Sequence, residues 1–186
     1  MRFTTTDVPP ATVVDLEKRE DERGWFARAF CADEYAEVGL TPVTAQTNMS
    51  LSRTRGTIRG LHFQTAPHEE AKLVRCLRGA ILDVAVDVRP GSETYLQHVA
   101  VELTEHDHRA LHVPEGFAHG FQALTDDVLL VYQVSASYTP GAEQGLRFDD
   151  PALGIAWPLP VTDISDKDAA WPLLSERQPD RGAVGT

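Results

Sequence analysis

Apolar and polar residues alternate through the middle of the chain, and this alternation predicts β-strands with one buried face. The predicted strands span residues 71–77, 80–88, 96–103, 110–113 and 128–134. The short segments between them, among them Arg78-Gly79, Arg89-Pro90-Gly91-Ser92 and Pro114-Glu115-Gly116, have the composition of turns. Because strands recur at short intervals with turns between them, the pattern predicts an all-β sandwich or barrel.

Helical patterning is confined to two short segments, residues 32–38 and 166–171. The Arg78-Gly79 turn is expected to join its flanking strands as a hairpin or as a tight corner. The chain has no internal repeat, low-complexity tract or linker, so residues 1–177 are expected to form one domain. The Gly-rich and charged tail, residues 178–186, is predicted to be disordered.

The composition is that of an ordinary globular protein, with 42% hydrophobic and 24% charged residues among 186. A net charge of −11 argues against a nucleic-acid-binding surface, which needs a basic face. No apolar run approaches the roughly 18 residues of a membrane span, and the first residues show no apolar signal-peptide region. Cys31 and Cys76 fit no ligand or redox spacing, so we expect two reduced thiols in a cytoplasmic protein.

Positive charge is concentrated in one stretch of this acidic chain. Between Leu51 and Arg78 there are six basic residues against two acidic ones, which predicts the electropositive floor of a pocket. Within this stretch, His62 can take a proton near neutral pH, and Arg59 can hold a phosphate bidentately. Lys72 can stabilise a developing negative charge. Together these residues indicate proton abstraction from a phosphorylated, nucleotide-linked substrate.

Three residues have two interpretations each. Lys72 shares a strand face with Val74 and Cys76, so it is either an edge lysine that reaches solvent or a lysine that lines a polar lumen. Tyr132 lies in an otherwise apolar strand, either as a core tyrosine or as a phenol that faces the lumen and can donate a proton. Tyr138 is either structural or directed at the substrate.

The segment from Pro114 to His119 has the Pro-x-Gly-x-x-His spacing of the second cupin motif. Cupins are double-sheet jelly rolls with the site inside. The metal-binding version also needs a His-x-His cluster in the first motif, whereas this chain offers only His62 and, six residues on, His68-Glu69. Since a tight metal site needs several well-placed ligands, a metal-free cupin is favoured.

Further segments, in order along the chain, resemble one known family. They are Asp21-Glu22-Arg23-Gly24-Trp25-Phe26, Gln46-Thr47-Asn48-Met49-Ser50, Arg59-Gly60-Leu61-His62-Phe63-Gln64, Ala71-Lys72-Leu73-Val74, Asp87-Val88-Arg89-Pro90-Gly91-Ser92, Pro114-Glu115-Gly116-Phe117-Ala118-His119-Gly120-Phe121, Asp149-Asp150-Pro151, Ile155-Ala156-Trp157-Pro158 and Ser165-Asp166-Lys167-Asp168. On these segments the chain resembles, over nearly its full length, the dTDP-4-dehydrorhamnose 3,5-epimerase family of the cupin superfold. Two positions depart from the family pattern: Arg28 stands where many members have glutamate, and Phe63 where tyrosine is common.

The resemblance implies a role for each matching residue. His62 would be the base, Asp168 its carboxylate partner and Tyr132 the acid on the opposite face of the sugar. Lys72 and His119 would stabilise the enolate. The substrate and its nucleotide diphosphate would be bound by Arg23, Phe26, Gln46, Asn48, Arg59 and Tyr138.

The resemblance implies a cupin jelly-roll epimerase that inverts carbon 3 and carbon 5 of a dTDP-4-keto-6-deoxyhexose through an enolate, in deoxysugar biosynthesis such as that of dTDP-rhamnose. It also implies no cofactor, and a homodimer in which N-terminal residues complete the partner's nucleotide pocket. Three alternatives stay open: inversion of carbon 3 alone, a metal-dependent cupin oxygenase or isomerase, and a non-catalytic sugar-nucleotide-binding cupin. The joint presence of His62, Asp168 and Tyr132 weighs against the last, because binding alone does not require them.

Overall fold

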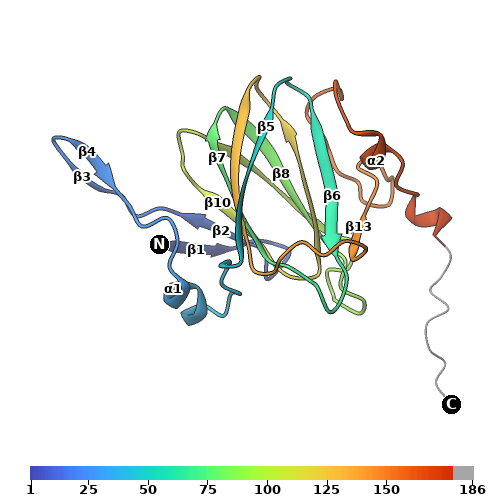
Figure 1. Cartoon of the computed structure of the whole chain (residues 1–186), viewed down its shortest axis with the longest axis horizontal. Coiled ribbons are helices and arrows are strands. Elements are labelled where there is room, and N and C mark those ends of the chain that lie inside the picture. Colours follow the sequence, from blue (N-terminus) through green and yellow to red (C-terminus); the bar gives the residue numbers. More distant parts are fainter. Residues whose placement is uncertain (178–186) are drawn as a thin grey trace, which may run out of the picture.

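Two antiparallel sheets pack face to face in the computed structural model, which describes residues 1–177 (Figure 1). The six-stranded sheet has the order β1 (Arg2–Thr5), β2 (Thr12–Asp15), β10 (Ala110–Val113), β7 (Lys72–Arg78), β12 (Val128–Val134) and β5 (Gln46–Ser52). The five-stranded sheet has the order β13 (Glu143–Gly145), β6 (Ile58–Gln64), β11 (Phe117–Ala123), β8 (Ala80–Asp87) and β9 (His98–Thr104). This arrangement confirms the predicted all-β sandwich; the predicted disordered tail lies outside the described residues.

The remaining elements are small. β3 (Arg19–Asp21) and β4 (Gly24–Phe26) pair only with each other and form an arm that projects away from the sheets (Figure 1). The helices are α1 (Ala32–Glu37), α2 (Asp166–Ala169) and a 3-10 turn at Leu174–Glu176. Both predicted helices are therefore present, each somewhat shorter than its sequence pattern suggested. Among the described residues, no helix is long and apolar enough to cross a membrane.

The turn at Gly79 is a corner rather than a hairpin. β7 pairs with β10 and β12 in one sheet, whereas β8 pairs with β11 and β9 in the other. Gly79 has a φ of +80°, and a Cβ there would collide with Thr125, so the corner needs glycine. The chain therefore passes from one sheet to the other within two residues, and the consecutive strands β7 and β8 supply opposite walls of the space between the sheets.

The space between the sheets holds the main core. Val74, Leu111 and Leu130 from the six-stranded sheet pack there with residues such as Ile81 and Phe121 from the five-stranded sheet. Burial of this apolar surface is the main term that holds the sheets together. Polar residues that share this interior must therefore have partners or a function.

The outer face of the five-stranded sheet is covered by residues 146–177, the C-terminal segment. Leu146 and Leu153 of this segment pack on Leu61, Val84 and other outward side chains of the sheet. Gln122, fully buried on β11, fixes the segment by exchanging two hydrogen bonds with the backbone of Leu159, at 2.9 and 3.1 Å. The segment then continues alongside β6, where α2 contacts the sheet (Figure 1).

One loop depends on a buried carboxylate at the end of β8. Asp87, whose side chain is fully buried, accepts hydrogen bonds from the side chains of Arg89 (2.7 and 2.9 Å), Ser92 (2.5 Å) and Thr94 (2.6 Å). Burial alone acts to raise the pKa of Asp87, but these donors outweigh it and hold the pKa well below the ordinary value. The ionised form is therefore the one that stabilises the fold.

We predict that Asp87→Asn lowers the free energy of unfolding at pH 7 by about 1–3 kcal/mol, since charged hydrogen bonds are lost in a buried site. A depressed folded-state pKa contributes stability above the unfolded pKa of about 4, and this contribution declines as the pH falls further. Urea titrations at pH 7 and pH 3 should thus give a smaller difference from wild type at pH 3. A difference of equal size at both pH values would contradict the account; Asp7→Asn, at an exposed position, is the control.

Candidate active site

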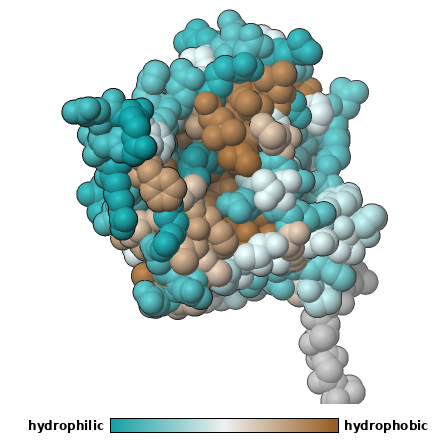
Figure 2. All heavy atoms as spheres, turned by 60° about the vertical axis from the view of Figure 1, so that its left-hand side comes forward, coloured by the Kyte–Doolittle hydropathy of each residue, from teal (hydrophilic) through white to brown (hydrophobic). Residues whose placement is uncertain are grey.

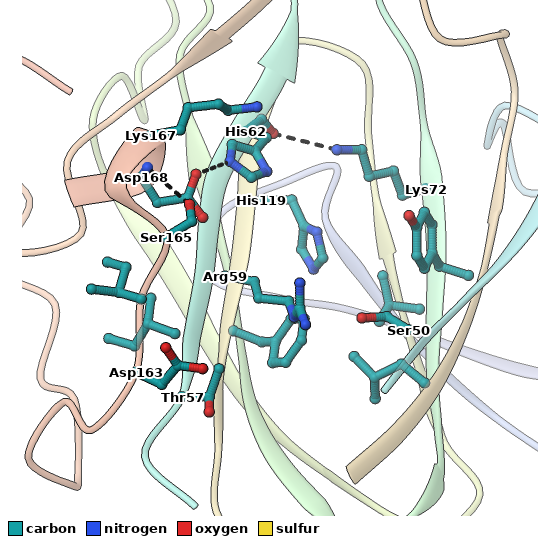
Figure 3. A pocket seen from close by; sticks show the side chains of 16 residues that line it. Ser50, Thr57, Arg59, His62, Lys72, His119, Asp163, Ser165, Lys167 and Asp168 are labelled. Atoms are coloured by element: carbon teal, nitrogen blue, oxygen red, sulfur yellow. Dashed lines mark hydrogen bonds and ion pairs between the residues drawn. The ribbon is translucent and has the colours of Figure 1, made fainter. Parts of the chain in front are cut away.

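A cavity of about 570 Å³ opens between the two sheets (Figure 3). Both sheets and the C-terminal segment contribute its walls. The residues that line it include Arg59, His62, Lys72, His119, Phe121, Tyr132, Ser165, Lys167 and Asp168. The strongest candidates from the sequence for base, acid, oxyanion contact and phosphate contact therefore share one cavity, although they are spread over more than 100 residues of chain.

β6 brings Arg59 and His62 to the same cavity although a regular strand would direct them to opposite faces. Side chains alternate along a strand, so residues three apart point in opposite directions. In the ladder with β11, however, His62 lies opposite His119 and Arg59 lies opposite Phe121. Between these two pairs, β6 advances by three residues and β11 by two, so β6 contains a β-bulge. The extra residue reverses the alternation of side chains between the two faces of the sheet.

Two glycines allow this bulge. Gly60 has a φ of +120°, and a Cβ on it would lie 2.5 Å from the Cα of Gly120 in the neighbouring strand. A Cβ on Gly120 would in turn lie 2.7 Å from the carbonyl oxygen of Arg59. Only glycine at both positions permits this approach of the two backbones.

His62 is paired with a buried carboxylate from α2. Its Nε2 lies 2.6 Å from Oδ1 of Asp168, and Asp168 Oδ2 accepts a hydrogen bond from the Gly60 amide at 3.1 Å (Figure 3). The Ser165 hydroxyl caps the helix by accepting from the Asp168 amide at 3.1 Å, which fixes the carboxylate's backbone. A carboxylate only accepts, so Nε2 of His62 carries a proton, and in the neutral ring the lone pair is on Nδ1.

The ionised state of Asp168 is stabilised by these contacts. Burial acts to raise the pKa of Asp168, but the hydrogen bond and charge of His62, together with the Gly60 and Ser165 bonds, outweigh it and lower the pKa. Asp168 is therefore a carboxylate at neutral pH, as an orienting partner of a basic imidazole must be.

Lys72 lines the lumen and not a sheet edge. It begins β7, which lies between β10 and β12, and its side chain is only 9% exposed. Its Nζ lies 3.1 Å from Oε1 of Glu70 and donates to the carbonyl oxygen of His62 at 3.4 Å (Figure 3). The lumen interpretation of Lys72 is therefore the one that the structure supports, and Glu70 is the counter-charge that keeps the ammonium group buried.

Tyr132 lines the same cavity from β12, on the sheet opposite His62. Burial raises the pKa of the Tyr132 phenol, and the charge of Glu70 raises it further, against a smaller opposite effect of Arg59. The phenol is therefore protonated at neutral pH. The candidate base and the candidate proton donor thus stand on opposite walls of one cavity.

Arg59 and His119 complete the nitrogen-bearing side chains that line the cavity. Arg59 Nε and Nη2 donate to the Ser52 hydroxyl and the Leu51 carbonyl, each at 3.2 Å, so its guanidinium group reaches across to β5. Within residues 1–177, Arg59 forms no ion pair with a carboxylate, and its charge remains available to an anion. His119 Nε2 lies 2.7 Å from Oδ1 of Asp83.

The remaining predicted binding residues fall into two groups. Gln46, Asn48 and Tyr138 line an adjoining cavity of about 150 Å³ that shares His62 and Tyr132 with the first. Arg23 and Phe26 lie on the β3–β4 arm, with side chains 89% and 70% exposed, and line neither of these two cavities. Within one chain, the structure does not bring the arm residues to the site.

Sequence reasoning missed four polar residues of the site. Asp83, Glu70, Ser165 and Lys167 contact or lie beside the predicted residues. Asp83 had a visible signal, because it is a charge at an inward position of the apolar strand Ile81–Val86. Ser165 also had one, as a serine preceding a short helix.

No group of three or more histidine, cysteine, aspartate or glutamate side chains in residues 1–177 is arranged to hold a metal ion. The expectation that the protein needs no metal therefore stays a prediction.

Fold and cavity together define a cupin whose lumen holds paired acid–base side chains. The family model of dTDP-4-dehydrorhamnose 3,5-epimerase matches residues 5–176. The protein of that name from Sinorhizobium fredii is 44% identical over 181 residues, which cover 95% of this chain and 91% of that protein. This chain belongs to the dTDP-4-dehydrorhamnose 3,5-epimerase family.

Two further relatives extend the comparison. A dTDP-4-dehydrorhamnose 3-epimerase from Streptomyces niveus is 38% identical over 187 residues, covering 100% of this chain and 89% of that protein. The crystal structure of a Legionella pneumophila dTDP-6-deoxy-D-glucose-3,5-epimerase in complex with dTDP-4-keto-L-rhamnose superposes with a TM-score of 0.87 at 38% identity, covering 95% of this chain and 94% of that one. These comparisons confirm the predicted family and the predicted cupin fold.

We predict that Gly60→Ala destabilises the protein and abolishes most activity. A side chain there must adopt a positive φ and collide with Gly120, and backbone strain of this kind costs about 1–3 kcal/mol before the clash is added. The folded fraction of Gly60→Ala should also lose turnover, because His62 and Arg59 are displaced together. Gly91→Ala is the matched control, since Gly91 also has a positive φ but nothing lies within 4 Å of its Cβ position. Equal unfolding free energies for the two variants would refute the role of the close approach.

Proposed function

We propose that this chain inverts carbon 3 and carbon 5 of a dTDP-4-keto-6-deoxyhexose by proton abstraction through an enolate, as a step of dTDP-rhamnose-like deoxysugar biosynthesis. The observation that carries the proposal is the position of the His62–Asp168 pair on one wall of the cavity and of Tyr132 on the other. A sugar ring between these walls has a base on one face and a proton donor on the opposite face.

The chemistry of the substrate requires this arrangement. Protons on carbons 3 and 5 of a 4-keto sugar are both alpha to the carbonyl and are acidified by it. Removal of one proton by Nδ1 of His62 produces an enolate, and delivery of a proton from Tyr132 to the other face of the same carbon inverts the centre. Proton transfer is the only bond change at each carbon, so the electrons balance without an oxidant.

The cations have separate roles in this proposal. Lys72 and His119 lie beside the acid–base pair and contact the carbonyl oxygen as it gains charge, where preorganised donors lower the barrier most. Arg59 has no carboxylate partner among residues 1–177 and binds the diphosphate. Gln46, Asn48 and Tyr138, in the adjoining cavity, bind the nucleotide and sugar portions.

The arm residues are explained by a homodimer. Arg23 and Phe26 are exposed in their own chain, and an arm that projects from the sheets can reach a second copy (Figure 1). On the outer side of the six-stranded sheet, Met49, Leu51 and Leu77 are 63%, 39% and 46% exposed. Figure 2 shows apolar side chains gathered on one face of the molecule, as is typical of an interaction surface. In this proposal the two copies meet through this sheet and exchange arms.

We predict that His62→Ala lowers turnover by at least about 10²–10⁴-fold, the range found for general acid–base groups. Binding of dTDP should be preserved, because Arg59 and the adjoining cavity are intact. Turnover is followed by NMR of the sugar protons, and dTDP affinity by calorimetry. His106→Ala, at an exposed side chain, is the control. Near-wild-type exchange of the alpha protons with solvent in His62→Ala would exclude His62 as the base.

We predict that Tyr132→Phe separates exchange from inversion. The substitution removes only the hydroxyl, so packing is kept, and His62 can still remove a proton and return one to the same face. In D₂O the substrate should therefore gain deuterium while its configuration is unchanged. Inversion at the wild-type rate would show that another group, such as Tyr138 or water, donates the proton.

We predict that mixed dimers regain activity. His62→Ala damages the cavity of its own chain, whereas an Arg23→Ala/Phe26→Ala chain damages only the arm. If the arm of each chain completes its partner's site, a mixture of the two inactive proteins contains dimers with one intact site, and activity returns after subunit exchange. Light scattering and tag capture show whether mixed dimers have formed. If they have formed and activity does not return, the arm completes the site of its own chain or no site at all.

A further inference from the structure

A second histidine–carboxylate pair lies in the cavity, next to the first. His119 on β11 is directly opposite His62 on β6 in the strand ladder, and its Nε2 lies 2.7 Å from Oδ1 of Asp83 on β8. The register of β8 and β11 places Asp83 opposite Phe121 and Ala85 opposite His119, so the pair is diagonal on the inward face of the sheet. The two pairs have the same chemical composition and use the same ring nitrogen, but they come from different elements.

Asp83 is a carboxylate in an apolar interior with a single partner. Its side chain is fully buried, and Ile81 and Ala85, on the same face of β8, belong to the core between the sheets. Its second oxygen, Oδ2, accepts no hydrogen bond from residues 1–177. Buried polar atoms are rarely left without a partner, and a fully buried carboxylate with one bond is costly to keep.

Asp87 on the same strand face shows what a structural carboxylate looks like in this fold. It accepts hydrogen bonds from Arg89, Ser92 and Thr94, and these bonds fix a loop. Among residues 1–177, the Asp83 side chain fixes no loop and forms a hydrogen bond only with His119, which lines the cavity. The buried position of Asp83 is therefore explained by its hydrogen bond to His119 and not by a loop that it stabilises.

We infer that Asp83 is a positioning residue that holds His119 with Nε2–H directed into the core and Nδ1–H directed at the cavity. The carboxylate accepts only, so it fixes the proton on Nε2. Its negative charge balances a second proton on the ring, and Nδ1–H of His119 then donates to the substrate's carbonyl oxygen as this becomes an enolate. This inference rests on the proposed epimerase function.

The two pairs then divide the work. His62 lies opposite His119 on the neighbouring strand, and both rings line the same cavity. In this inference His62 presents the lone pair of Nδ1 to the substrate, whereas His119 presents an N–H. His119 is also the less exposed of the two, at 11% against 28% of the side chain, which suits a fixed donor.

A double-mutant cycle tests the inference. Asp83→Asn keeps the shape of the side chain, and we expect it to lower kcat by about 10–10²-fold. This loss is no larger than the roughly 10²–10³-fold loss found when an oxyanion donor is removed altogether, because His119 itself is still present. KM and the Kd of dTDP should stay within about twofold, because the diphosphate contacts are untouched. In a His119→Gln background, Asp83→Asn should change kcat by less than about twofold, since it acts only through the ring.

Multiplicative effects in the cycle, or an unchanged kcat in Asp83→Asn, would show that Asp83 is structural. Asp87→Asn is the matched control: it removes a buried carboxylate from the same strand face, and we expect it to lower stability without changing the kcat of the folded protein.

NMR of the wild-type protein tests the inference without any reliance on the folding of a variant. The protein is labelled with ¹⁵N-histidine and studied with bound dTDP. The ring signals of His119 are assigned as those that are missing from the spectrum of His119→Gln. We expect both ring nitrogens to be protonated, with Nε2–H in the hydrogen bond. A neutral ring, or a proton on Nδ1 alone, would overturn the inference. If the wild-type protein proved inactive on dTDP-4-keto sugars, the proposed function would fail, whereas this spectrum would still report on the Asp83–His119 pair.

Discussion

The close approach of β6 and β11 at Gly60 and Gly120 is the constraint on which the site depends. It permits the bulge that directs both Arg59 and His62 into the cavity, and it frees the Gly60 amide to hold Asp168. Any side chain at either glycine would separate the strands and displace Arg59 and His62 together. The chemistry of the cavity is thus set by a backbone contact that involves no side chain.

A second constraint is electrostatic. The chain has a net charge of −11, yet its cavity is lined by Arg59, Lys72, Lys167 and two histidines. Lys72 and the two histidines each have a single acidic partner that fixes the position of the side chain: Glu70 for Lys72, Asp168 for His62 and Asp83 for His119. Charges held in this way, away from bulk water, need no reorganisation when an enolate forms, which is the condition under which they lower a barrier. Because the rest of the chain is acidic, the positive side chains of this cavity are the ones that attract a nucleotide diphosphate.

The sequence predicted the fold class, the family and most of the cavity, for physical reasons that can be identified. Alternation located β7, β8, β10 and β12 because apolar residues recur at every second position along much of each strand. It did not predict β6, since a bulge reverses the alternation within that strand. Nor could local pattern decide between a hairpin and a corner at Gly79, because that choice depends on which distant strands pair with β7 and β8.

Contacts between distant residues were the least predictable part. Asp83 became a site residue only when folding placed it beside His119, 36 residues further along the chain, and its own neighbours in sequence gave no partner. The arm residue Phe26 shows the opposite case: its family motif predicted a binding role, but one chain alone does not place it in the cavity. A motif identifies the residue, whereas its surroundings are a property of the folded and assembled protein.

The central claim is that one base and one acid, on opposite walls, invert two carbons that flank the same carbonyl. The most direct measurement is the reaction of wild-type protein with dTDP-4-keto-6-deoxyglucose in D₂O, followed at each carbon by NMR. The account predicts one deuteron at carbon 3 and one at carbon 5, each in a product with inverted configuration at that centre. Deuterium at carbon 3 alone, or inversion without any incorporation of solvent deuterium, would contradict it.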